Sequence, residues 1–352
     1  MDGPARELLD RLLETATPSG YETAGQRTWL EAVTSVADDV HTDAYGNAVA
    51  TYQGGTPSIV IAGHGDEIGL IVRRIDDDGF IHPDSIGGAD RTVTRGQHVT
   101  LHTAAGPLQG VIGQTAIHLR DPDEDSIVDV TEQRVDIGAR DGAEARELVE
   151  VGDPITISGS VRELHGERLS ARGLDNRMGI WSVATAFRRI VEAGPAATVH
   201  AVSTIQEEVG LQGARMVGFD LDPDAVVAVD VTHATDHPAA PDDAGADLAL
   251  GGGPVINRGS VNHPRLVEIL RHAADAADIE VQLQAIGTQS STDADAFYTQ
   301  RGGVPTAAVG VPLRYMHTPV ETIDFGDLSA TRDLLAAFVS RAAEDPDFVL
   351  EV

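Results

Sequence analysis

The hydrophobic positions of this chain follow helical spacing at its start and form short apolar runs soon afterwards. Ala5–Ala16 places its leucines on one face and is followed by Thr-Pro-Ser-Gly, so we expect an amphipathic helix there. A second helix is predicted over Tyr21–Val36. The apolar run Ser58–Ala62 is typical of a buried strand, and further strands are expected at Asp39–Asp43 and Ala48–Tyr52.

The pattern changes between about residues 72 and 165. Short alternating segments such as Val99–His102 and Leu108–Ile112 are broken there by Gly, Pro and Asp, which predicts a small β-barrel-like domain. Helices and strands alternate again afterwards. We therefore expect an α/β domain, residues 1–71 and 166–352, interrupted by a β insert, residues 72–165.

In the later part of the α/β domain, four more helices and four strands are predicted, together with a long final helix for which only the start is predicted. In chain order these are helix Arg177–Ala193, strand Thr198–Thr204, helix Leu211–Val217, strand Ala225–Val231, helix Pro264–Ala277, strand Glu280–Ala285, helix Asp293–Arg301, strand Thr306–Val309 and the helix from Asp327.

Composition limits the kinds of metal site and the cellular location. The 352 residues contain no cysteine, so any metal must be bound through nitrogen and oxygen, which suits Zn²⁺, Co²⁺ or Mn²⁺. The apolar runs are far shorter than a membrane span, and the chain begins with an amphipathic helix in place of an apolar signal stretch. We expect a cytoplasmic protein that does not enter a membrane.

Charge is the next strong signal. The formal net charge is −31, and all 25 basic residues are arginine. The excess acids are scattered along the chain and do not form a tail, which is typical of a protein from a salt-accumulating halophile. With no basic patch available, nucleic acid and anionic membranes are excluded as partners at ordinary salt.

Five short segments each place a metal-ligand side chain at or beside the end of a predicted buried strand. They are Gly63–Glu67, Leu174–Arg177, Gln206–Gly210, Val229–Thr232 and Tyr315–Pro319. Together they supply two imidazoles, three candidate ligand carboxylates and one spare glutamate. That set is typical of a hydrolase in which two metal ions share a bridging carboxylate and activate a water.

Taken singly, these residues have ordinary interpretations. Asp66 can accept a hydrogen bond from the imidazole of His64, which would orient that ligand, but the pair also suits a plain turn. Asp175 precedes a helix and could be an N-cap or a carboxylate that bridges two metals. After the strand that precedes Glu207 and Glu208, one glutamate could bind metal while the other acts as general base.

The remaining candidates are Asp230, at the end of one predicted strand, and His317, shortly after another. His233 and His237 follow Asp230 and compete with these residues as ligands. Because we place both in a polar loop away from a strand end, we favour them less.

The motifs taken together resemble the tetrahedral (TET) aminopeptidases, the glutamyl-aminopeptidase-like family of dinuclear metallopeptidases. The resemblance covers the whole chain and rests on Pro18–Glu22, His64–Gly69, Leu174–Arg177, Glu207–Gly210, Asp230, Gly252–Pro254, Thr292–Ala294 and Val311–His317. The chain departs from the family pattern at Gly65, where methionine is common, and at Thr318, where serine is common.

The resemblance implies two divalent ions per subunit, Zn²⁺ or Co²⁺. Their ligands would be His64, Asp175 and Asp230 for one ion, and Asp175, Glu208 and His317 for the other. Asp175 is then the bridge, Glu207 the general base, and Asp66 the residue that orients His64. The peptide bond that follows Asp175 is expected to be cis.

The resemblance also implies a fold and an activity. The fold is a mixed-sheet metallopeptidase domain of the phosphorylase/hydrolase-like type with an inserted PDZ-like β-barrel, through which subunits dimerise. Dimers would assemble into a hollow, self-compartmentalised tetrahedral dodecamer that removes N-terminal residues from short peptides. Gly252–Pro254 would either shape the leaving-side pocket or form a plain glycine turn.

Three other functions remain open at this point. A related deacylase or carboxypeptidase could use the same metals on a different substrate end. An endoglucanase could use paired carboxylates, although an aromatic content of 4% disfavours a cleft that stacks on sugars. A non-catalytic metal-binding scaffold is disfavoured because the spare Glu207 is present.

Overall fold

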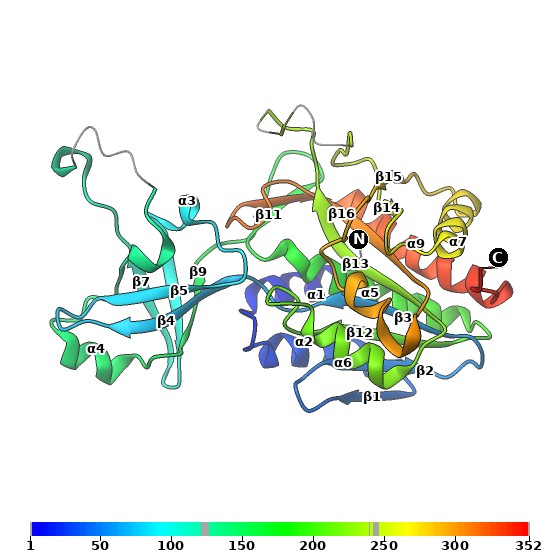
Figure 1. Cartoon of the computed structure of the whole chain (residues 1–352), viewed down its shortest axis with the longest axis horizontal. Coiled ribbons are helices and arrows are strands. Elements are labelled where there is room, and N and C mark those ends of the chain that lie inside the picture. Colours follow the sequence, from blue (N-terminus) through cyan, green and yellow to red (C-terminus); the bar gives the residue numbers. More distant parts are fainter. Residues whose placement is uncertain (1, 121–126, 239, 242–245, 351–352) are drawn as a thin grey trace.

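The computed structural model describes residues 2–120, 127–238, 240–241 and 246–350. Figure 1 shows a large α/β part on the right and a smaller β part on the left. The helices are α1 (Gly3–Glu14), α2 (Thr23–Val33), α3 (Arg91–Thr94), α4 (Gly142–Leu148), α5 (Leu174–Ala193), α6 (Gln212–Leu221), α7 (Pro264–Ala276), α8 (Ala294–Phe297) and α9 (Phe325–Glu344), with 3₁₀ helices η1 (Ile117–Leu119), η2 (Val130–Glu132) and η3 (Gln300–Gly302).

The strands form one large sheet, one small sheet and a barrel. They are β1 (Asp39–Thr42), β2 (Ala48–Tyr52), β3 (Ser58–His64), β4 (Gly69–Ile75), β5 (Ile81–Ile86), β6 (His98–Thr103), β7 (Gly106–Ile112), β8 (Val135–Asp136), β9 (Pro154–Ile157), β10 (Arg162–Glu163), β11 (Arg168–Ala171), β12 (Thr198–Thr204), β13 (Ala225–His233), β14 (Val255–Arg258), β15 (Gln282–Ala285), β16 (Thr306–Leu313) and β17 (Glu321–Asp324).

The large sheet has eight strands in the order β1-β2-β12-β3-β13-β16-β14-β15. Its centre is parallel, because β3 pairs in parallel with β12 and β13, and β13 pairs in parallel with β16. The edges are mixed, since β2 runs antiparallel to β12 and β14 antiparallel to β16. The carboxyl ends of the four central strands therefore meet at one edge, where open α/β sheets place their sites.

Helices cover both faces of this sheet. Along β3, Ile59 and Ile61 pack in the largest core cluster with residues of α1, α5, α7 and α9. The alternate residues Val60 and Ala62 pack on the opposite face with Phe297 and residues of α6 and α8. Because successive side chains of a strand point to opposite faces, this buried strand is apolar throughout. The mixed α/β prediction is confirmed.

The smaller part is a closed antiparallel barrel in the order β4-β5-β8-β7-β6-β9. It has its own apolar core, which includes Leu70, Val99 and Ile155. The predicted barrel is therefore confirmed. Its strands run from Gly69 to Ile157, so β4 begins before the expected boundary at residue 72. After β9 the chain returns to the large part, where β10 and β11 join β17 in a three-stranded sheet.

Some predicted boundaries were wrong. The helix expected over Asp293–Arg301 ends at Phe297, and Arg301 lies in η3 with φ of +51°, which a continuous helix cannot accommodate. The strand expected over Ala225–Val231 continues to His233, so His233 lies at the end of β13. None of the helices in the described ranges is long and apolar enough to span a bilayer.

Candidate metal centre

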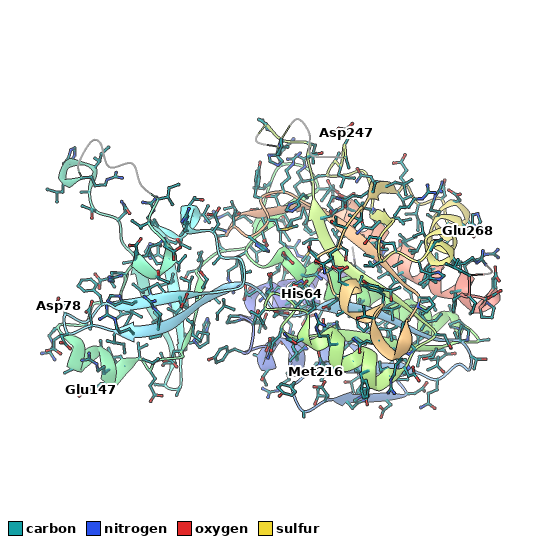
Figure 2. The ribbon with its side chains drawn as sticks, viewed as in Figure 1. His64, Asp78, Glu147, Met216, Asp247 and Glu268 are labelled. Carbon is teal, nitrogen blue, oxygen red and sulfur yellow. The ribbon has the colours of Figure 1, made fainter. Side chains whose placement is uncertain are left out.

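The first candidate ligand group gathers at the carboxyl edge of the large sheet. His64 is the last residue of β3, Asp230 lies in β13, and Asp175 lies at the start of α5; all three are buried. Nε2 of His64 lies 3.2 Å from Oδ1 of Asp175 and 3.5 Å from Oδ1 of Asp230. Figure 2 labels His64 within the large α/β part, on its side nearer the barrel. These three side chains could hold one metal ion.

The second group shares Asp175 with the first. Nε2 of His317 lies 3.3 Å from Oδ2 of Asp175 and 3.6 Å from Oε2 of Glu208. Asp175 thus turns one carboxylate oxygen towards His64 and the other towards His317. Asp175, Glu208 and His317 also form a group that could hold a metal ion. The side chain expected to bridge two ions is therefore the one that lies between the two histidines.

The donor set fits divalent cations. Two ligand atoms that are each bound tetrahedrally to Zn²⁺ at 2.0–2.2 Å lie about 3.3 Å apart, close to the separations of 3.2 and 3.3 Å from Asp175 to His64 and His317. Within the described residues, Oδ1 of Asp175 and Oε1 of Glu208 are buried without a hydrogen-bond partner. Buried carboxylate oxygens are costly in that state, and a cation would satisfy them.

The peptide bond between Asp175 and Asn176 is cis, as the resemblance predicted. Asp175 and Asn176 have non-helical dihedral angles within the first turn of α5. Asn176 is fully buried, and its side-chain amide donates to the backbone carbonyl of Val229 at 2.8 Å. The segment that carries Asp175 is thereby tied to the strand that carries Asp230.

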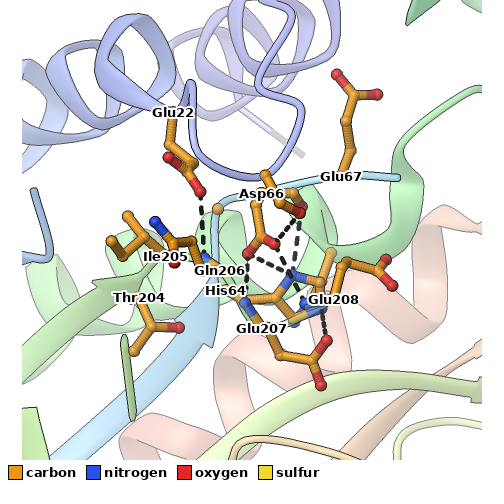
Figure 3. A network of polar contacts seen from close by, with 12 residues as sticks. Glu22, His64, Asp66, Glu67, Thr204, Ile205, Gln206, Glu207 and Glu208 are labelled. Carbon is orange, nitrogen blue, oxygen red and sulfur yellow. Dashed lines mark hydrogen bonds and ion pairs between the residues drawn. The ribbon is translucent and has the colours of Figure 1, made fainter. Parts of the chain in front are cut away.

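Asp66 connects His64 to the segment that carries the two glutamates. Its Oδ1 lies 3.3 Å from Nδ1 of His64 and accepts a hydrogen bond from the backbone N–H of Glu207 at 3.1 Å. Its Oδ2 accepts from the N–H of Glu208 at 3.2 Å and from the Ser19 hydroxyl at 2.6 Å. Figure 3 shows dashed lines from the Asp66 carboxylate to His64 and to this segment. A fully buried carboxylate with these donors is suited to orient the imidazole.

Glu207 lies beside the first group, with Oε2 3.8 Å from Nε2 of His64. Burial, together with the carboxylates of Asp230, Asp293 and Glu208, raises the pKa of Glu207 to about 10. Positive ions in the same pocket would lower that pKa towards neutrality. A glutamate whose pKa responds in this way can accept and return a proton.

The two histidines have raised pKa values for the complementary reason. Burial lowers the pKa of His64, but Glu207, Asp230 and Asp175 outweigh it and raise that pKa well above its ordinary value. The contact with Asp175 raises the pKa of His317 to about 9. Each imidazole therefore occupies a place with strongly negative surroundings, where a metal ion would also be stabilised.

A cavity of about 390 Å³ opens beside the ligands. His64, Glu207, Glu208 and His317 line it, and His233 contributes from the end of β13. A volume in this range suits a small organic ligand. His233 was predicted to lie in a polar loop, but it lines the cavity from the end of a strand. Among the described residues it belongs to none of the groups that could hold a metal ion.

Two other sequence candidates, His237 and Gly252–Pro254, do not line this cavity. The ring of His237 packs edge-on against Tyr315, with ring centroids 5.2 Å apart. Asp327 at the start of α9 accepts hydrogen bonds from the N–H groups of Gly251 and Gly253, each at 2.7 Å. Gly252–Pro254 does not line the cavity, so its geometry favours a glycine turn held by α9.

Sequence reasoning did not assign three buried carboxylates close to the site. Glu22 accepts from the backbone N–H of Gln206 at 3.2 Å, as Figure 3 also shows, and Glu321 accepts from the N–H groups of Asp175 and His317. Asp293 accepts from the Thr204 hydroxyl at 2.5 Å. Glu22 and Asp293 lie in motifs that supported the family resemblance. Their place in those motifs could have marked them as residues near the site, although no role was assigned to them.

Comparisons with known proteins identify relatives of this chain. The lysyl aminopeptidase of Pyrococcus furiosus is 33% identical over 338 residues, which cover 95% of this chain and 96% of that protein. The TET aminopeptidase from the marine sediment archaeon Thaumarchaeota archaeon SCGC AB-539-E09 has a TM-score of 0.90 at 31% identity, and the match covers 96% of both chains.

A second solved structure is similar over almost its whole length. The Pyrococcus horikoshii TET1 peptidase, which can assemble into a tetrahedron or a large octahedral shell, has a TM-score of 0.85 at 31% identity. The match covers 95% of this chain and 98% of that chain. The M42 glutamyl aminopeptidase family itself matches residues 46–334. From the site geometry and these matches, the chain belongs to the M42 glutamyl aminopeptidase family.

Proposed function

We propose that this protein is a metal-dependent aminopeptidase that removes N-terminal residues from short peptides. The observation that carries the proposal is the position of Asp175, whose two oxygens face two different histidines at 3.2 and 3.3 Å. A carboxylate placed in this way, with a free glutamate beside it, suits hydrolysis assisted by two metals. Membership of the M42 family supports the peptidase assignment.

The ligand assignment follows from the two groups of side chains. One divalent ion would be held by His64, Asp175 and Asp230, and the other by Asp175, Glu208 and His317. We propose Zn²⁺ or Co²⁺, because imidazole nitrogen and carboxylate oxygen suit both ions and no thiolate is available. When bound, two such ions supply Lewis-acid polarisation of a peptide carbonyl and lower the pKa of a water.

Proton transfer would be the task of Glu207. Its carboxylate accepts a proton from the attacking water and returns it to the amine that leaves when the peptide bond breaks. Asp66 keeps this segment in place through the N–H groups of Glu207 and Glu208. The cavity of about 390 Å³ in front of these residues would hold the N-terminal end of the peptide.

We further propose that the barrel is a dimerisation domain and that dimers assemble into a tetrahedral dodecamer. The division into a catalytic domain, residues 1–71 and 166–352, and an insert, residues 72–165, is part of this proposal. Support comes from exposed apolar side chains in the barrel region, with Ile117 70% and Leu119 79% exposed. Exposed apolar side chains of this kind support the proposal that another subunit covers this surface. A cytoplasmic location in a halophile accords with the net charge of −31.

Light scattering in high salt tests the assembly. A mass many times the 37.0 kDa of one chain is expected. Exchange of Leu119 for Glu should reduce that mass, whereas the same exchange at Leu350, which is 47% exposed near the C-terminus, serves as the control. A wild-type mass near that of one chain would reject the oligomer.

Substrate choice tests the function. We expect turnover of aminoacyl-p-nitroanilides and unblocked peptides, loss of turnover with 1,10-phenanthroline, and recovery with Zn²⁺ or Co²⁺. N-acetylated peptides and cellulose should not be hydrolysed. Cleavage of blocked substrates at a comparable rate would favour a deacylase or carboxypeptidase, and full activity in a preparation shown by elemental analysis to lack metal would reject the two-metal proposal.

A further inference from the structure

Glu321 joins the backbones of two candidate ligands. It is the first residue of β17 and is 2% exposed. Its Oε2 accepts a hydrogen bond from the backbone N–H of Asp175 at 3.2 Å. Its Oε1 accepts one from the backbone N–H of His317 at 2.9 Å. One buried carboxylate therefore contacts two of the three residues in the group Asp175, Glu208 and His317.

The strand that carries Glu321 is held firmly between these two segments. Glu321 is paired with Ala171 in the antiparallel ladder of β17 and β11, and β11 leads into the turn before Asp175. The next residue, Thr322, exchanges two backbone hydrogen bonds with Arg314, each at 3.0 Å. Arg314 shortly precedes His317. The carboxylate thus projects from a strand that is fixed to both ligand-bearing segments.

The two ligands need such support because their backbones are irregular. His317 has φ of +61°, in the left-handed region that residues with a side chain rarely adopt. Asp175 has φ of −75° and ψ of 110°, which is not helical although α5 begins at Leu174. Asp175 lies in the first turn of α5, where a helix leaves backbone N–H groups without a partner, and its N–H donates to Glu321, as does that of His317. The side chain thus supplies the hydrogen-bond acceptor for a backbone N–H at both positions.

We propose that Glu321 is a positioning residue that sets the separation of Asp175 from His317 and thereby the second metal site. This inference rests on the proposed function, since it concerns the same candidate ligands. Glu321 itself belongs to none of the ligand groups found among the described residues, and each of its oxygens accepts a hydrogen bond from one of the two N–H groups. Outer residues of this kind typically change metal affinity by about 10- to 100-fold when they are replaced.

The chemistry of the side chain makes the proposal specific. Only a carboxylate presents two acceptor oxygens side by side, as two N–H donors require. In Glu321→Gln the side-chain amide keeps one acceptor oxygen. Its NH₂ group must then face the second backbone N–H, and two donors that face each other cannot form a hydrogen bond. The glutamine variant has almost the same size, so it changes hydrogen bonding with little change in packing. Glu321→Ala removes both acceptors.

The experiment is a titration of the metal-free, full-length protein with Co²⁺ in high salt. Binding is monitored by calorimetry and by the visible absorption of the bound ion. Glu321→Gln and Glu321→Ala are compared with Thr322→Val. The valine variant removes a hydroxyl on the same strand whose one hydrogen bond within the described part of the chain is to the Val320 carbonyl, at 3.0 Å. Unfolding of each metal-free variant by denaturant is measured alongside, and kcat is measured as a function of free Co²⁺.

For the wild type we expect two bound ions, and for Glu321→Gln a loss of about 10- to 100-fold in affinity at one of the two steps. The activity of Glu321→Gln should return when excess Co²⁺ is supplied. Thr322→Val should bind Co²⁺ with the same affinities as the wild type. Glu321→Ala should show the larger loss of the two. A merely structural residue would lower the stability of the metal-free protein without changing the ratio of the two affinities.

Two results would overturn the inference alone. In the first, Glu321→Gln binds both ions with wild-type affinities; in the second, both affinities fall equally together with the free energy of unfolding. A wild-type protein that binds fewer than two Co²⁺ ions would instead overturn the proposed function, and this inference with it. The behaviour of the wild type therefore separates the two failures.

Discussion

The backbone N–H of Glu207 donates a hydrogen bond to Oδ1 of Asp66 at 3.1 Å, so the orientation of the candidate base depends on a residue two positions after a candidate ligand. The same carboxylate accepts from the N–H of Glu208 and lies 3.3 Å from Nδ1 of His64. One buried side chain thus fixes an imidazole and the segment that carries both glutamates. Loss of its negative charge should affect metal binding and proton transfer together.

Asp66→Asn tests this connection. An asparagine offers one acceptor oxygen, and its NH₂ group would face either a backbone N–H or the histidine, so the segment must shift. We expect metal affinity to fall by about 10- to 100-fold and kcat to fall with it. Metal analysis after dialysis and steady-state kinetics provide the readouts. Ser19→Ala, which removes only the 2.6 Å hydrogen bond to Asp66, should have the smaller effect; an Asp66→Asn protein with normal metal content and rate would contradict the assignment.

Glu207→Gln and Glu208→Gln should differ in kind. The amide at position 207 cannot take up the proton of the attacking water, so we expect both metals to remain while kcat falls by at least about 10²–10⁴-fold. Glu208 faces His317 at 3.6 Å in the second group, so its replacement should lower metal content first. Elemental analysis beside kcat distinguishes them. A Glu207→Gln enzyme that keeps its metals and its rate would remove Glu207 from the mechanism.

Much of this arrangement could be predicted because it follows from strand ends. His64 ends β3, and Glu207 follows β12 closely, so apolar runs followed by acids or histidines located them. Asp230 was found from the same pattern, but β13 continues past it because Val231 remains buried. The pattern identified the residue but ended the strand at Val231, two residues before its end at His233.

Other features could not be predicted because they depend on the conformation of distant segments. Glu321 lies four residues after His317 in an ordinary-looking strand, and only the folded chain brings it to the N–H of Asp175. The helix predicted over Asp293–Arg301 failed for a related reason. Its helical spacing is real as far as Phe297, but Arg301 takes a left-handed φ that the pattern of apolar residues does not reveal.

Acid stability should depend on Glu67. This fully buried carboxylate pairs with Arg172 and with Arg177, the latter at 2.7 Å. Burial opposes ionisation, but the two arginines lower the pKa of Glu67 from its ordinary 4.5 to about 2. Because the folded-state pKa lies below the unfolded value, its contribution to stability is complete above pH 4.5 and is lost as the pH falls towards 2.

Glu67→Gln should therefore lower the free energy of unfolding at pH 7 by about 3–5 kcal/mol, since Arg177 would stay buried without its partner. It should also flatten the pH dependence of stability between pH 4.5 and 2. Denaturant unfolding across that range measures both effects. Glu163→Gln, which breaks an exposed pair with Arg6, is the control and should cost less than about 1 kcal/mol. An equal loss in the two variants would show that burial of the Glu67 pair contributes nothing extra.

Salt dependence is expected from charge alone. With 56 acids, 25 arginines and no lysine, the surface of each subunit carries strong repulsion between carboxylates. At molar salt the screening length falls to about 3 Å, so neighbouring carboxylates largely cease to interact. Salts whose anions are excluded from the surface also strengthen apolar burial. Activity and assembly should therefore be greatest in molar KCl or NaCl, and both should be lost over hours in dilute buffer.

Divalent cations separate this mechanism from a general effect of osmotic strength. Mg²⁺ should protect at lower concentration than K⁺ because it screens and binds carboxylates more strongly, whereas an uncharged osmolyte should protect little. Sedimentation and peptidase rate are measured across a series from dilute buffer to saturating salt. The concentration of Zn²⁺ or Co²⁺ is held constant, so that activity lost through release of the metal is not mistaken for activity lost through dissociation of the subunits. The same rate and the same sedimentation coefficient at both ends would show that the acidic surface is not an adaptation to salt.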